Sequence, residues 1–243
     1  MGELVAWWAG GIEPGAPSWW EQDADEPFYA ASLMKVPLAI AAERIDLDRS
    51  VPVHDDFESA VGGRFTILRE DDQDEPTWDA LGESLSLREL RRRAIIDSSN
   101  IATNLLLEET GIAAVQEVLA AAGCSERTAI GRGIGDLAAR DAGLANDVTA
   151  RDLARILQHL PPGVEEVMRD QQYRAGIPAG LPAGPLVANK TGWMEEFTHD
   201  VAIIRPVAGE PFGLVVLTRG LDSHEDAERR IAALAAEAWE RRP

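Results

Sequence analysis

Three short groups of residues have the types and spacing that acyl transfer requires. The first is Ser32 and Lys35, at the start of an apolar, alanine-rich stretch. Residues at i and i+3 of a helix share a face, so the hydroxyl and the amine can meet. A serine beside an amine that can accept its proton is an activated nucleophile. At a helix start, the backbone N–H of Ser32 lacks an intrahelical acceptor and can stabilise a developing oxyanion.

The second group is Ser98 and Asn100, which lie between two helical patterns, with Asn104 one turn further on. Polar side chains at such a junction can converge on a cleft. A serine and asparagine turn that caps a helix is the ordinary structural explanation of the same residues.

The third group is the segment Lys190-Thr191-Gly192-Trp193, close to the C-terminal end. On a strand, Lys190 and Gly192 point to the same face, and the glycine leaves that face bare for a substrate beneath the lysine. Thr191 adds a hydroxyl, and the N–H of Trp193 is a candidate second oxyanion donor. Each group alone has a structural explanation, so the functional prediction depends on all three occurring together.

Hydrophobic patterns predict the elements that position these groups. Residues 4–22 are expected to form a hairpin, and the Ser32 helix is expected to run to about residue 43. Ser86 with Glu89 and Ser223 with Asp226 are two capping boxes that begin helices. Further helices are predicted at 101–109, 113–122 and 150–160, and strands at 186–191, 201–204 and 212–218. This order predicts an α+β fold in which the two ends of the chain share one sheet.

Composition narrows the class of protein further. The chain has 243 residues, of which 45% are hydrophobic and 27% charged, as in an ordinary globular protein. The only cysteine is Cys124, which excludes an internal disulfide and a cysteine-cluster metal site. No metal or cofactor is expected. The net charge of −19 argues against nucleic-acid and anionic-membrane partners.

The N-terminal sequence carries no basic region and no cleavage site, which predicts a cytoplasmic protein. A secreted protein shortened by its leader would show the same pattern. No apolar run is long enough to cross a membrane. The oligomeric state is left open.

In their order and context, the three groups resemble the class A β-lactamase-like branch of the penicillin-recognising serine hydrolases, whose signature combines Ser-x-x-Lys, Ser-Asp-Asn and Lys-Thr-Gly. The resemblance covers nearly the whole chain and is closest around residues 29–43, 95–107 and 187–194. It implies a single domain over 1–243, with an α/β part at 1–45 and 185–243. The α/β part would be an antiparallel sheet with the N- and C-terminal helices packed on it. The middle of the chain, at about 46–184, would form a separate all-helical region.

The resemblance also implies roles. Ser32 would form an acyl-enzyme, Lys35 would be its base or proton shuttle, and Ser98 would relay a proton to the leaving nitrogen. The substrate-binding residues would be Asn100 for the substrate amide, Lys190 and Thr191 for a carboxylate, and Gly192 and Trp193 along the strand. The backbone N–H groups of Ser32 and Trp193 would form the oxyanion hole.

The sequence departs from the family pattern at several positions. Ser99 replaces the central aspartate of the second motif. The family carries a glutamate in the segment at 131–147 that activates the deacylating water, and this segment has none. Asp136 or Asp141 could substitute, or could serve as a helix cap or a surface ion pair. The family often places an arginine after Lys-Thr-Gly, whereas this chain has His199, which could face the pocket or pair with Asp200.

These departures affect deacylation more than acylation. The sequence therefore predicts a serine hydrolase that cleaves an amide, ester or β-lactam in a small molecule or peptide through acyl-Ser32, with slow or differently organised deacylation. Two alternatives stay open: an acyltransferase that uses the same acyl-enzyme, and a penicillin-binding or sensor protein without turnover.

Overall fold

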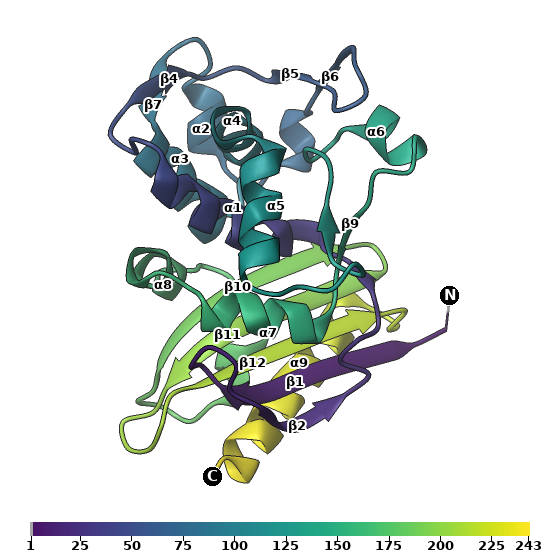
Figure 1. Ribbon diagram of the computed structural model, residues 1–243, viewed down its shortest axis with the longest axis vertical. Helices are drawn as coiled ribbons and strands as arrows, with labels where there is room; N and C mark the ends of the chain where they lie inside the picture. The colour runs from purple at the N-terminus through teal and green to yellow at the C-terminus, as the bar shows by residue number, and fades with distance from the viewer. Residues whose placement is uncertain (1) are drawn as a thin grey trace.

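The computed structural model describes residues 2–243, and its centre is a five-stranded antiparallel sheet of order β10-β11-β12-β1-β2 (Figure 1). The strands are β1 (Leu4–Gly11), β2 (Ser18–Gln22), β10 (Leu186–Met194), β11 (Phe197–Arg205) and β12 (Phe212–Arg219). Strand β1 pairs with β12 from Leu4 opposite Arg219 to Gly11 opposite Phe212. This pairing confirms that the two ends of the chain share one sheet, and it leaves β10 as an edge strand.

Helices cover both faces of the sheet, which explains the apolar runs in its strands. The helix α9 (His224–Arg241) lies behind the sheet in Figure 1, and α7 (Ala150–Gln158) lies in front. In β1, Val5 faces the cluster that includes α9, whereas Ala6 faces the cluster that includes α7. A strand that is buried on both sides loses the alternation of polar and apolar residues.

Helix α9 begins and packs as its sequence predicts. The Ser223 hydroxyl accepts the N–H of Asp226 at 3.1 Å and caps the first turn. The apolar stripe that faces the sheet is completely buried and consists of Ala227, Ile231, Leu234, Ala235 and Ala238. The predicted cap Ser86 likewise accepts the N–H of Glu89, and Thr149 accepts the N–H of Asp152 at the start of α7.

The helical region stands above the sheet in Figure 1 and also contains short strands, which corrects the all-helical region that the resemblance implies. Its helices are α2 (Glu75–Asp79), α3 (Leu87–Ile96), α4 (Asn100–Thr110), α5 (Ile112–Ala121), α6 (Leu137–Asp141) and α8 (Pro162–Arg169), with the short 3₁₀ helix η3 (Arg69–Asp71). Its strands are β4 (Ser50–Pro52), β5 (Asp56–Glu58), β6 (Arg64–Thr66), β7 (Ser84–Ser86), β8 (Ala129–Ile130) and β9 (Asn146–Val148). The segments that link the helices pair with one another as short strands, and this pairing supplies hydrogen-bond partners for their backbone N–H and C=O groups. Strand β9 also pairs with β3 (Phe28–Tyr29) from the N-terminal part.

The N-terminal helix is divided into three parts. A 3₁₀ turn η1 (Ala31–Met34) holds Ser32, then α1 (Lys35–Ala41) begins, and η2 (Ala42–Arg44) ends the segment. Pro37 is the third residue of α1, in the first turn, where backbone N–H groups have no intrahelical acceptor. The proline therefore costs no helical hydrogen bond within α1. Among the described residues, no helix is both long and apolar enough to span a membrane.

The junction between α9 and the short 3₁₀ helix η4 (Ile177–Gly180) offers a test of this packing. A Cβ added at Gly180 would overlap the carbonyl of Ala232 and lie 2.9 Å from the Ala235 Cβ. We expect Gly180→Ala to lower the free energy of unfolding by about 2–3 kcal/mol, because overpacking against backbone cannot relax through a rotamer change. The matched control is Gly163→Ala, whose added methyl would meet Glu43 only at 3.5 Å. Chemical denaturation of both variants measures the difference, and equal stability would contradict the packing described.

Candidate active site

The three predicted groups meet around the hydroxyl of Ser98. Its Oγ donates a hydrogen bond to the Ser32 Oγ at 2.9 Å. The same oxygen accepts from the Nζ of Lys190 at 3.0 Å and lies 3.3 Å from the Nζ of Lys35. Residues from η1, from the α3–α4 junction and from β10 thus share one hydroxyl.

Lys35 reaches Ser32 through Ser98. Its Nζ donates to the backbone carbonyl of Ser98 at 2.6 Å and to the Asn100 Oδ1 at 2.9 Å. In the described chain, the hydrogen bonds of this amine go to Ser98 and Asn100 and none goes to Ser32 directly. The sequence predicts that the two side chains meet directly, whereas in the structure a hydrogen-bonded relay through the Ser98 hydroxyl connects them.

The two lysines are almost completely buried, with 1% of Lys35 and 0% of Lys190 exposed to solvent. Burial, together with the neighbouring charge of Lys190, holds the pKa of Lys35 well below its usual range. Burial also lowers the pKa of Lys190 to about 7. Two ammonium groups on one hydroxyl would repel each other, so the site favours a state in which at least one amine is neutral and can accept a proton.

The backbone around Ser98 is held in an uncommon conformation. Ser98 has φ of 59°, in the left-handed region that non-glycine residues rarely adopt. Next to it, the Asp72 carboxylate accepts the N–H of Asn100 at 2.9 Å and the N–H of Ile101 at 2.8 Å. These bonds cap the start of α4 and fix the turn that presents Ser98 to the cleft.

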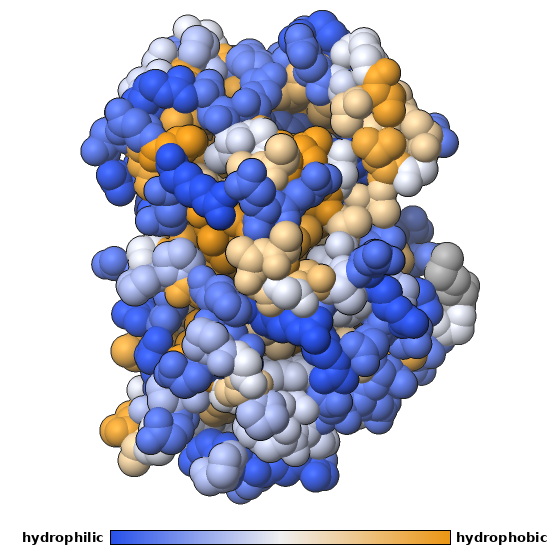
Figure 2. All heavy atoms as spheres, viewed as in Figure 1, coloured by the Kyte–Doolittle hydropathy of each residue, from blue (hydrophilic) through white to orange (hydrophobic). Residues whose placement is uncertain are grey.

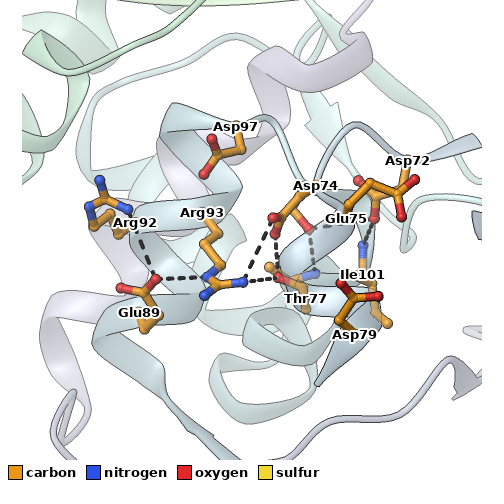
Figure 3. A network of polar contacts seen from close by, with 12 residues as sticks. Asp72, Asp74, Glu75, Thr77, Asp79, Glu89, Arg92, Arg93, Asp97 and Ile101 are labelled. Atoms are coloured by element: carbon orange, nitrogen blue, oxygen red, sulfur yellow. Dashed lines mark hydrogen bonds and ion pairs between the residues drawn. The ribbon is translucent and has the colours of Figure 1, made fainter. Parts of the chain in front are cut away.

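The acidic residues at 70–75 are therefore only in part a solvated loop, which is the structure that a run of like charges by itself indicates. Figure 3 shows Arg93 of α3 between Glu89 and Asp74, with the Arg93–Asp74 ion pair at 3.7 Å. Asp74 is 3% exposed, and its carboxylate also accepts from Thr77. This network ties the run to α3, and Asp72 lies within the same run. The sequence offered no signal that separates these structural acids from their exposed neighbours.

Strand β10 passes close to the turn that carries Ser32. A Cβ built on Gly192 would lie 3.0 Å from the Ser32 backbone nitrogen and 3.2 Å from that of Leu33. Any larger residue would push the strand away from η1, so the glycine has a steric role here as well as the predicted bare face. Just before the serine, Ala31 has φ of 45°, a second strained residue at the site.

An open cleft of about 850 Å³ leads to these residues. Ser32, Ser98, Asn100 and Trp193 line it, together with apolar residues from β3, the segment at 131–147 and the β10–β11 turn. Those apolar residues are Tyr29, Ile134, Leu137, Leu144, Met194 and Phe197. Charged residues line it as well, namely Glu70, Asp71, Arg132, Arg140 and Asp147. Figure 2 shows apolar atoms gathered around α6, where Leu137 is 55% exposed. The cleft thus suits a substrate with an apolar part near the nucleophile.

Lys190 and Thr191 do not form a joint carboxylate site in this cleft. The Lys190 Nζ donates to the Ser98 Oγ and, at 2.8 Å, to the carbonyl of Thr191. The Thr191 side chain lies on the α9 face of the sheet, because successive residues of a strand point to opposite faces. This corrects the prediction that both side chains grip a substrate group together.

His199 is a buried structural residue and neither faces the cleft nor pairs with Asp200. Its Nδ1 accepts the N–H of Thr218 at 3.2 Å, so Nε2 carries the proton and donates to the carbonyl of Tyr29 at 3.0 Å. Burial lowers the pKa of His199 to about 4, which keeps the ring neutral at pH 7. Asp200 points to the opposite face of β11, as strand alternation requires.

Neither predicted deacylation acid reaches the cleft. Asp136 is buried, caps α6 through the N–H of Ala139 at 3.0 Å and accepts from Ser59 at 2.9 Å. Asp141 is exposed and pairs with Arg140. Both therefore serve the structural alternatives that the sequence also allowed.

Several other residues of the same segment line the cleft and were not singled out from sequence, among them Asp147 and Ile134. Asp147 of β9 is half-buried, and burial raises the pKa of its carboxyl. Ile134 is fixed to α4 because the side chain of Asn104 binds its N–H at 2.9 Å and its carbonyl at 2.8 Å. In the sequence, the spacing of Asn104 four residues after Asn100 was the only signal that could have indicated a role for Asn104 in holding this segment. Among residues 2–243, no cluster of three His, Cys, Asp or Glu side chains is arranged to hold a metal ion.

The sequence and the fold of this chain were compared with those of known proteins. The model of the β-lactamase enzyme family matches residues 12–241. A structure of L2 complexed with relebactam is 26% identical with a TM-score of 0.80, over 97% of this chain and 90% of that chain. A β-lactamase from Sphaerobacter thermophilus is 25% identical with a TM-score of 0.75, over 98% and 90% of the two chains. PBP-A, at 19% identity over 98% and 90% of the chains and a TM-score of 0.76, shares the fold. No curated protein matches the chain.

Proposed function

The chain belongs to the β-lactamase enzyme family, and from that premise we propose that it is a serine hydrolase that acts through an acyl-Ser32 intermediate. Its substrate would be a small molecule or peptide with an amide, ester or β-lactam bond. The observation that carries the proposal is the relay from Ser32 through the Ser98 hydroxyl to two buried amines of lowered pKa. Such a relay removes a proton from a weak nucleophile at neutral pH.

Acylation would proceed in two proton-transfer steps. The Ser32 hydroxyl passes its proton to Ser98, whose own proton goes to a neutral lysine, while the Ser32 oxygen attacks the substrate carbonyl. The N–H groups of Ser32 and Trp193 would hold the negative charge on the carbonyl oxygen. When the carbon–leaving-group bond breaks, the proton returns through Ser98 to the leaving atom, and acyl-Ser32 remains.

Hydrolysis of the acyl-enzyme would be the slower half of the reaction. A positioned general base typically contributes about 10²–10⁴ to such a step. The wall of the cleft in the segment at 131–147 carries the side chain of Ile134, and the carboxyl groups of Asp136 and Asp141 are engaged elsewhere. Asp147 is the acid of this segment that lines the cleft.

One experiment separates hydrolase, acyltransferase and non-turnover protein. The protein is incubated with a reactive β-lactam and with an activated ester, with and without a primary amine, while product and intact mass are followed. Hydrolysed product supports the hydrolase, and amide product formed only with the amine supports acyl transfer. A persistent adduct supports a stalled, sensor-like site. No adduct and no product with either compound would refute an acyl-enzyme on these substrates.

The lowered lysine pKa values predict the pH dependence of acylation. The amine that receives the proton must be neutral, and the neutral form dominates above its pKa. With the pKa of Lys190 at about 7 and that of Lys35 also lowered, acylation should fall as pH drops below neutrality and level off on the alkaline side. Stopped-flow measurement of the acylation rate from acidic to alkaline pH tests this. A rate that keeps rising towards the pKa of an ordinary lysine would contradict the proposed base.

A further inference from the structure

A second cavity lies on the α9 face of the sheet, beside the catalytic strand. It has a volume of about 180 Å³ and is lined by residues of β10, β11 and α9 and by Tyr173. The indole of Trp193 borders both this cavity and the substrate cleft. A cavity of roughly 150 Å³ holds a benzene molecule, so the space is large enough for a small organic group. Below it is called the Trp193 cavity.

Aromatic rings form one corner of the Trp193 cavity. The rings of Tyr173 and Trp193 meet edge to face with centroids 4.7 Å apart, and His224 lies 5.9 Å from Trp193. The face of an indole or phenol ring attracts cations through its quadrupole. Neither lysine nor arginine is among the residues that line the cavity in the described chain, so an anion would find no fixed positive charge there.

Two carboxyl groups, those of Asp200 and Glu228, also line the cavity. Asp200 is completely buried, and its two oxygens accept from Asn189 at 3.1 Å and from the N–H of Ile177 at 2.8 Å. The charges of Lys190 and Arg174 act on it from nearby, but neither forms an ion pair with it among residues 2–243, and burial raises the pKa of its carboxyl to about 7. Glu228 of α9 adds a half-buried carboxylate, one oxygen of which lies 3.2 Å from the His224 Nε2. A buried carboxyl that no cation contacts directly gains from an incoming ammonium group.

The hydroxyl of Thr191 is a second, independent observation that points to a bound group in this cavity. Thr191 is 9% exposed, and its Oγ1 has no hydrogen-bond partner within the described residues. A buried polar atom left unpaired costs free energy, so such atoms usually bind water or a ligand. A primary ammonium group carries three N–H donors and no acceptor, which suits the oxygens of Thr191 and Asp200 together with an aromatic face.

We propose that the Trp193 cavity binds a primary ammonium group. We further infer, resting on the hydrolase function proposed above, that the substrate carries this ammonium on the part that extends along β10 past Trp193. The group would lie on the far side of Trp193 from the Ser32 hydroxyl. It therefore anchors the substrate and takes no part in bond cleavage.

The first test measures binding in the absence of turnover. In Ser32→Ala protein, calorimetry and tryptophan fluorescence should detect n-propylammonium binding at millimolar concentration, with no binding of propionate or propanol. Asp200→Asn and Thr191→Val, which preserve side-chain size, should each weaken binding at least tenfold. The control Glu225→Gln removes an exposed acid of α9 that pairs with Arg229 outside the cavity, and should bind as the parent does. Equal binding of all three probes, or no binding of the amine, would leave water as the occupant and overturn the proposal. Circular dichroism and thermal melting establish that each variant is folded.

The second test separates a substrate group from a free amine. Two activated esters that differ only in an ammonium or a hydroxyl at the end of the leaving group are compared with Ser32 intact. The ammonium ester should be preferred at least tenfold in kcat/KM, and Asp200→Asn should abolish this preference. The readout is the ratio of kcat/KM for the two esters, because Asp200 also acts on the pKa of Lys190 and its loss changes both rates together. Amine binding without any preference would overturn the substrate assignment and leave a site for free amines. Amine binding with neither ester hydrolysed would refute the proposed function and leave the cavity assignment intact.

Discussion

Replacing Ser32 by alanine should abolish the covalent adduct and lower kcat by on the order of 10⁶, as removal of a catalytic serine does in subtilisin. The Ser98 hydroxyl and both lysines would still be present, but the site would have no oxygen to attack the carbonyl. Intact-mass spectrometry after incubation with a reactive β-lactam or an activated ester measures the adduct, and steady-state kinetics measure the loss of rate.

The control for this variant is another serine far from the cleft. Ser50 of β4 is exposed, so Ser50→Ala should leave adduct formation and rate unchanged. Ser32 is only half-buried in a short 3₁₀ turn, and its loss should leave the fold intact. An adduct of full stoichiometry in Ser32→Ala protein would show that another residue is the nucleophile and would end the proposed mechanism.

Introducing a glutamate at Ile134 should speed deacylation by about 10²-fold, the lower end of what a positioned general base supplies. The reason is geometric. The side chain of Asn104 holds both backbone groups of Ile134, which fixes this position relative to α4, and the Ile134 side chain lines the cleft that contains Ser32. A carboxylate there could hold a water between itself and the acyl carbon.

The matched control is Ile134→Gln, which has the size of glutamate without its basicity and should leave the deacylation rate low. Decay of a preformed acyl-enzyme, followed by mass spectrometry after removal of excess reagent, gives the rate for each variant. In the parent protein, Asp147→Asn tests whether the cleft acid of β9 supplies the residual rate. An acyl-enzyme that decays equally fast in the parent, Glu and Gln proteins would mean that deacylation does not depend on a base at this position.

The sequence by itself determined the fold class and indicated which polar residues meet at the candidate site, because both depend on local signals. The caps at Ser223 and Thr149 and the apolar stripe of α9 are set by neighbours within a turn or two. Ser-x-x-Lys and Lys-Thr-Gly are short segments whose spacing carries meaning without any long-range contact.

The relay and the side-chain directions were decided only by the tertiary structure. The three groups are separated by 66 residues between Ser32 and Ser98 and by 92 between Ser98 and Lys190, so their contact depends on how the helical region docks against β10. As a result of that docking, the amine of Lys35 is connected to the Ser32 hydroxyl by hydrogen bonds through Ser98. It also buries both amines, which lowers the pKa of each.

The corrections have the same origin. The resemblance implied a substrate-binding role for Thr191 and left His199 either facing the pocket or paired with Asp200, whereas the register of β10 and β11 fixes the face to which each points. Asp136 could be placed at a cap, and Asp72 at the start of α4, only when the partner N–H groups were located in space. A sequence specifies which groups are available, but burial, orientation and pKa arise from segments that meet only after folding, because they depend on the distance between atoms and on the exclusion of water around them.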